Sequence, residues 1–166
     1  MRKNLFICLG IFSSLAASRF IPHPPNFTSL IALSFYVPVL LGLRFLPFLI
    51  ISFAITDLFI GYHTGTHWTW GSVLVIGLVS QYFNKNLNFR LVGALFGASI
   101  FFLITNLGVW LSGGLYELTI SGLITCFTLA LPFFGYTAIS TLIFSVIFES
   151  IFKYKRIIFK KINLSL

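Results

Sequence analysis

The residues able to bind an ion or a polar ligand are few, and they fall in alternate gaps between long apolar segments. These gaps contain Arg19, His23, Asp57, His63, His67 and Glu117. Guanidinium, imidazole and carboxylate groups are costly near a membrane interior unless they are paired or in contact with water, and such groups often mark ligand or ion paths. We therefore place the candidate site in these gaps.

The apolar segments between them predict an integral membrane protein. Of the 166 residues, 58% are hydrophobic and 8% are charged, and the mean hydropathy is +1.01. A crossing helix needs about 17–25 mostly apolar residues, so the chain has room for about six. The predicted spans are Asn4 to Phe20, Thr28 to Leu43, Phe45 to Ile60, Trp70 to Phe83, Leu91 to Leu111 and Pro132 to Phe152.

The last span is preceded by an apolar stretch, Thr119 to Leu131, that would make a single helix well over thirty residues long. Because proline interrupts the helical hydrogen-bond ladder, we expect a separate short helix ending before Pro132. The fold class predicted is thus an all-α bundle of about six transmembrane helices with this extra helix. Residues 1–152 would form one transmembrane domain and residues 153–166 a basic cytoplasmic tail.

The basic residues set the expected orientation, since short cytoplasmic loops carry an excess of Lys and Arg. Ten of the eleven basic residues fall on one side, leaving Arg19 alone on the other. Those ten are Arg2, Lys3, Arg44, Lys85, Arg90, Lys153, Lys155, Arg156, Lys160 and Lys161. The protein is therefore expected in a bacterial inner membrane, with both termini on the cytoplasmic side. The net charge of +8 reflects this topology and does not indicate a nucleic-acid partner.

Several classes of function find no support in the sequence. It contains no Walker loop, no GxGxxG, no HExxH and no nucleophile elbow, so no enzyme activity and no cofactor is predicted. Cys8 and Cys126 are far apart in apolar sequence and are expected to be inert thiols. The first span has an alternative interpretation as a signal peptide, because Arg2 and Lys3 precede an apolar run ending in small residues.

The first outer gap, Arg19 to Phe27, contains three prolines that are expected to hold the backbone extended and stiff. Arg19, His23 and Asn26 supply polar groups there, so the loop can act as a lid. Asp57 lies about 18 Å along its predicted span, in the outer third of the membrane. It is expected to bind a ligand, to pair with Arg19, or both.

The second outer gap, Gly61 to Trp70, contains two histidines and two tryptophans. His63 and His67 are spaced i and i+4, which on a helix would let both bind one metal ion, although Gly65 weakens that helix. Trp68 and Trp70 are typical of the interfacial aromatic belt. A ligand contact by Trp68 and a metal site at the histidines both remain open at this point.

Two further spans carry polar groups. Asn106 and Trp110 share a helical face and are expected at a pocket wall or a helix contact. The small residues Gly93, Ala94, Gly97 and Ala98 on the same span predict close helix packing. Glu149 and Lys153, spaced i and i+4 in the last span, are expected to form an ion pair.

Several of these segments together resemble a bacterial family of uncharacterised multi-span proteins that is similar to the substrate-binding S components of energy-coupling factor transporters. The matching segments are Arg19, the run Pro22 to Phe27, Asp57 with Gly61, the run Phe101 to Trp110, and Pro132 with the two phenylalanines that follow. The resemblance implies a subunit that captures a micronutrient under the first outer loop. It also implies docking, through small residues such as Gly10, Ser13 and Ala17, on a transmembrane coupling protein with ATPase subunits.

The function predicted is therefore reversible binding of a small, vitamin-like molecule for uptake, without an ATPase in the chain. Its ligand-binding residues would be Arg19, His23, Asn26, Asp57, His63, His67, Trp68, Asn106 and Trp110. Two alternatives remain: a membrane enzyme with a metal at His23, His63, His67 and Asp57, and a scaffold subunit whose polar residues satisfy one another. The partners expected are the ligand, the coupling module and membrane lipids.

Overall fold

The computed structural model describes residues 2–62 and 65–163, and these residues form helices with no strand between them. The six α-helices are α1 (Arg2–Phe20), α2 (Leu30–Tyr36), α3 (Leu46–Ile60), α4 (Thr66–Val79), α5 (Leu87–Leu111) and α6 (Ile120–Asn163). Short π and 3-10 segments are η1 (Val37–Leu41), η2 (Leu43–Phe45) and η3 (Ser80–Phe83). The prediction of an all-α chain is confirmed.

Three helical segments in the described part of the chain are long and apolar enough to cross a membrane: Leu43–Ile60, Leu87–Leu111 and Ile120–Tyr154. Asn4–Phe20 and Leu30–Leu41 are apolar but shorter, and α4 has 14 residues. The structure thus supports a helical membrane protein, while six complete crossings stay a prediction.

The expected break before Pro132 is wrong, because α6 runs through this residue as one helix of 44 residues. An internal proline removes one backbone hydrogen bond and costs about 3 kcal/mol. Leaving the helix within an apolar layer would strip partners from several backbone groups, each costing several kcal/mol. Continuing the helix is the cheaper solution, so no separate helix covers Thr119 to Leu131.

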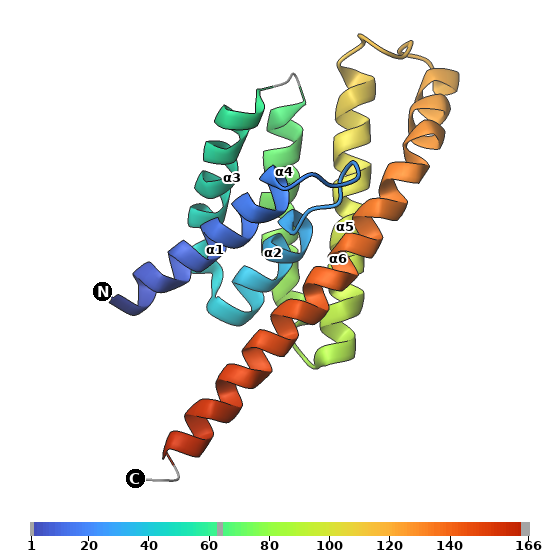
Figure 1. Ribbon diagram of the computed structural model, residues 1–166. Helices are drawn as coiled ribbons and strands as arrows, with labels where there is room; N and C mark the ends of the chain where they lie inside the picture. The colour runs from blue at the N-terminus through green and yellow to red at the C-terminus, as the bar shows by residue number, and fades with distance from the viewer. Residues whose placement is uncertain (1, 63–64, 164–166) are drawn as a thin grey trace.

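Helix α2 is the centre of the bundle, and all of its residues are buried. It contacts α4, α5 and α6, while α1 packs on α3, and α5 packs along α6 (Figure 1). Small residues let α5 approach its neighbours: a Cβ on Gly93 would lie 2.7 Å from the Phe35 ring of α2. Gly93, Ala94, Gly97 and Ala98 are all buried, which confirms their predicted role in close packing.

The first loop reaches across this bundle. After α1 it runs towards α5 and α6 and returns to α2, well below the ends of α3 to α6 that lie at the top of the view (Figure 1). Hydroxyl contacts tie its base to α1: Ser29 Oγ lies 2.8 Å from Ser18 Oγ and donates to the Ser14 carbonyl at 3.2 Å. The loop thereby brings polar groups next to the last turns of α1 and α3.

Candidate functional site

A buried ion pair joins the last turn of α1 to the last turn of α3. Arg19 Nη2 lies 2.6 Å from Asp57 Oδ1, and the two side chains are only 13% and 7% exposed. Removing two charges from water is costly, and their attraction offsets this cost only when the remaining donors and acceptors are also satisfied. The surroundings of the pair meet this requirement.

Arg19 has three hydrogen-bond acceptors on α3. Its Nη1 donates to the Thr56 hydroxyl and, at 3.4 Å, to the Phe53 carbonyl. The guanidinium carbon also lies 4.5 Å from the centre of the Phe53 ring, a cation–π distance. Arg19 therefore fixes the end of α1 against one face of α3.

Asp57 is satisfied on its second oxygen by a residue that the sequence did not single out as a ligand contact. The Trp70 indole N–H donates to Asp57 Oδ2 at 2.7 Å. Trp70 had been assigned to the interfacial aromatic belt. The sequence did contain a signal for this contact. Trp70 follows Asp57 across a short loop between two helices, and antiparallel neighbouring helices bring residues near their shared loop to the same level.

The ion pair borders a cavity of about 240 Å³ below the first loop. Its polar lining comes from Arg19, His23, Asn26, Thr28, Asp57, Thr69 and Thr137, and its apolar lining from Leu30, Ile31, Phe53, Ile60 and Phe101. All six α-helices and the loop thus contribute to one small cavity of mixed character. Four of the predicted site residues meet there: Arg19, His23, Asn26 and Asp57.

The loop over this cavity is a turn, so the expectation of an extended backbone is wrong. Phe27 N–H donates to the Pro24 carbonyl at 3.0 Å, and Asn26 adopts φ 62°, a left-handed conformation that asparagine tolerates. Prolines restrict φ but allow a turn at Pro24 and Pro25. The Asn26 carbonyl accepts a hydrogen bond from Ser140 Oγ at 3.5 Å, which links the turn to α6.

The other predicted site residues lie elsewhere. Trp68 packs on Gly108, where a Cβ would lie 2.3 Å from its ring, and His67 is exposed beside it. Asn106 Nδ2 donates to the carbonyl of Phe102 in its own helix at 2.7 Å. Trp110 donates to the Glu117 carbonyl at 2.9 Å. None of these four lines the cavity, and His63 lies outside the described residues.

The metal-site alternative receives no support from the described residues, which contain no group of three His, Cys, Asp or Glu side chains able to hold a metal ion. His67 lies beside Trp68, and His23 contacts the Pro24 carbonyl through Nδ1 at 2.8 Å. Cys8 and Cys126 are free thiols.

A second ion pair lies at the opposite end of the bundle and replaces the expected pair of Glu149 with Lys153. Glu149 instead accepts two bonds from Arg90 of α5, at 2.5 Å and 2.9 Å. A bidentate guanidinium pair is more directional and better shielded than an exposed lysine at i+4. This pair joins the first turn of α5 to α6.

These features define an all-helical protein with helices able to span a membrane, in which a buried ion pair borders a small cavity under a proline-containing turn. The chain belongs to the family of unknown function DUF6580, whose family model matches residues 1–161. Neither a curated protein nor a solved structure matches the chain.

Proposed function

We propose that this chain is a membrane-embedded binding subunit that takes up a small, vitamin-like molecule across a bacterial inner membrane. One observation carries the proposal: the ion pair of Arg19 and Asp57 borders a cavity of about 240 Å³ that the first loop covers. Intramembrane charges beside a cavity are typical of ligand or ion sites. The resemblance to S components points in the same direction.

The lining suggests which chemistry the ligand would have. Arg19 is already neutralised by Asp57, so an anion would have to compete with a buried carboxylate for the guanidinium. The threonine hydroxyls and His23 suit hydrogen bonds to a neutral molecule, and the Phe53 and Phe101 rings suit an apolar face. The ligand is therefore small and uncharged or zwitterionic.

Uptake by such a subunit requires a partner. The sequence has no Walker motif, so energy would come from a transmembrane coupling protein with ATPase subunits, as the resemblance implies. The exposed small residues Gly10, Ser13 and Ala17 on α1 are the proposed contact.

The rival is a scaffold role, and it also rests on an observation. Asp57 accepts a bond on each carboxylate oxygen, and Arg19 has three protein acceptors, so both charges are hydrogen-bonded by protein groups without a ligand. A binding subunit should hold a small molecule in the cavity, whereas a scaffold subunit should not.

The test is native mass spectrometry of the protein purified from its own membranes, searching for a retained small molecule. Thr137→Val removes a cavity hydroxyl while keeping nearly the same shape, and it should lower retention about tenfold. Thr128→Val is the control: both threonines lie on α6 and donate to the carbonyl four residues earlier, but Thr128 is exposed and away from the cavity. A protein with no bound molecule, or equal retention in both variants, would leave the scaffold role standing.

A further inference from the structure

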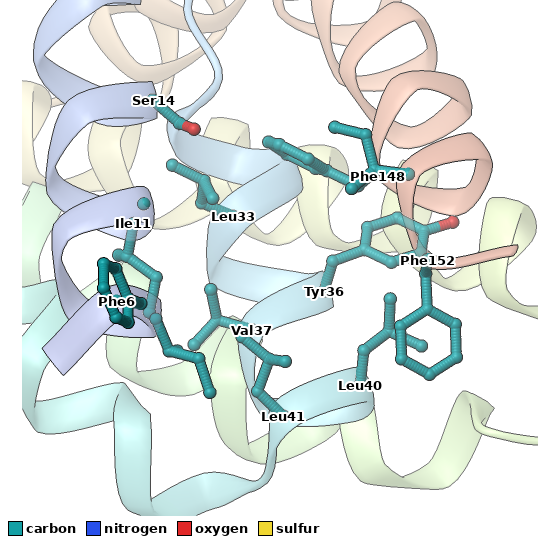
Figure 2. Close-up of a pocket in the computed structure, with 13 residues that line it drawn as sticks. Phe6, Ile11, Ser14, Leu33, Tyr36, Val37, Leu40, Leu41, Phe148 and Phe152 are labelled. Atoms are coloured by element: carbon teal, nitrogen blue, oxygen red, sulfur yellow. The ribbon is translucent and has the colours of Figure 1, made fainter. Parts of the chain in front are cut away.

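A second cavity lies at the opposite end of the bundle and is almost wholly apolar. The first half of α1 and the second half of α6 diverge there over α2 and η1, leaving a groove of about 300 Å³ (Figure 2). One wall is Phe6, Ile7, Gly10, Ile11 and Ser14, and the other is Phe148, Ile151 and Phe152. Leu33, Tyr36, Val37, Leu40 and Leu41 form the floor. We name this the inner groove.

The inner groove is open to its surroundings along α1. Phe6 is 71% exposed, and a Cβ on Gly10 would meet no atom within 4 Å. A glycine with open space beside it, set between two lining residues one turn away, leaves a slot in the helix surface. Such a slot in a lipid-facing wall is filled by something from the bilayer or from a partner.

The charge around one end of the groove favours a particular occupant. Lys153 follows the lining residue Phe152 directly, and Arg44 follows Leu41 by three residues. Arg2 and Lys3 begin α1, one turn before Phe6. All four are therefore within about a turn of a lining residue at the same end of the molecule.

Among the described residues, no acidic side chain forms an ion pair with Arg44 or Lys153. Glu149 is engaged by Arg90 through both carboxylate oxygens, and Asp57 by Arg19 at the other end of α1. Glu117 lies in the loop between α5 and α6, at the far end of α6. An apolar slot with a basic rim matches an amphiphile that has an apolar chain and an anionic head.

We propose that the inner groove binds one acyl chain of an anionic phospholipid, with the phosphate held by Arg44 and Lys153 at the groove's end. A transmembrane helix is about 10–12 Å across. A groove of about 300 Å³ is too small to hold one. An acyl chain is thin and flexible and suits a groove with apolar walls that include Phe6 and Phe148. The proposal does not depend on a ligand in the cavity below the first loop, but the lipid and the proposed coupling protein would share Gly10.

The experiment measures lipid binding to the full chain by native mass spectrometry in detergent, titrating phosphatidylglycerol against phosphatidylcholine with identical acyl chains. The expected result is one tightly bound phosphatidylglycerol, with an affinity at least about tenfold above that of phosphatidylcholine. Gly10→Phe fills the slot and should abolish this first binding event. Gly71→Phe is the matched control, because Gly71 of α4 also has no atom within 4 Å of its added Cβ and lies away from the groove.

A second pair of variants tests the charged rim and does not depend on filling the slot. Lys153→Gln with Arg44→Gln should reduce the preference for phosphatidylglycerol several-fold, whereas Lys85→Gln, in the loop before α5, should leave it unchanged. Equal affinity for both lipids overturns the proposal, as does unchanged binding in Gly10→Phe. A shift of Gly10→Phe from dimer to monomer, with lipid binding unaffected, would overturn it in favour of a second copy in the groove.

Discussion

Trp70 and Arg19 hold Asp57 from two sides, one on each carboxylate oxygen. Trp70 Nε1 donates to Oδ2 at 2.7 Å and Arg19 Nη2 to Oδ1 at 2.6 Å. Three helices, α1, α3 and α4, therefore meet at one carboxylate. These two bonds fix the position of Asp57 at the edge of the cavity below the first loop, before any ligand enters.

Trp70→Phe should weaken this junction while keeping most of the ring volume. One oxygen of a buried carboxylate would lose its donor, which costs about 1–3 kcal/mol. Thermal unfolding in detergent should show a clear fall in Tm. Trp110→Phe is the control, since its indole bond to the Glu117 carbonyl is exposed and its loss should cost less. Equal Tm values for the two variants would contradict the role assigned to Trp70.

Replacing both members of the ion pair separates stability from binding. Asp57→Leu alone leaves Arg19 buried without its counter-charge and should cost about 3–5 kcal/mol. Adding Arg19→Met should recover most of that loss, because a buried pair replaced by apolar residues is often neutral or stabilising.

The double variant should nevertheless lose the retained small molecule, since the cavity loses its charged wall. Unfolding temperature and native mass spectrometry measured on the same preparations report both effects. Recovery of stability together with full ligand retention would show that the pair serves packing alone.

The ion pair of Arg90 and Glu149 predicts that lysine cannot replace arginine at position 90. Arg90→Lys keeps the charge but loses the bidentate geometry with Glu149, so Tm should fall although the net charge is unchanged. Lys153→Gln removes a positive charge from the residue one turn after Glu149, and it should leave Tm nearly unchanged because Lys153 makes no ion pair with Glu149. A larger effect at Lys153 would restore the pairing expected from the sequence.

Sequence reasoning worked where the cause was local or compositional. Apolar content and segment length predicted the helical class, and the spacing of Gly93 and Gly97 predicted close packing of α5. The pairing of Arg19 with Asp57 was one of two roles expected for Asp57, because Arg19 is the only basic residue predicted on that side, and the structure shows the pair.

Sequence reasoning failed where the outcome depends on which groups the fold brings together. Glu149 had two possible cations, and the sequence favoured the local Lys153, whereas helix packing brought Arg90 from α5. Pro132 was read by its local effect on one helical bond, but the surrounding apolar layer favours a continuous α6. For Asn106 the sequence left a pocket wall and a helix contact open, and the structure adds a bond from its amide to the Phe102 carbonyl of its own helix.

The contact between Trp68 and Gly108 yields the last prediction. A Cβ on Gly108 would lie 2.3–2.5 Å from atoms of the indole ring, closer than any real contact, so the ring or α5 must move. Gly108→Ala should therefore destabilise the protein by about 1–3 kcal/mol, despite the higher helix propensity of alanine. Gly135→Ala on α6 is the matched control, because its Cβ would meet nothing within 4 Å and the substitution should be neutral or stabilising by up to about 1 kcal/mol. Opposite signs of the two Tm shifts would establish that Trp68 packs against α5, and a stabilising Gly108→Ala would show that it is free to bind a ligand.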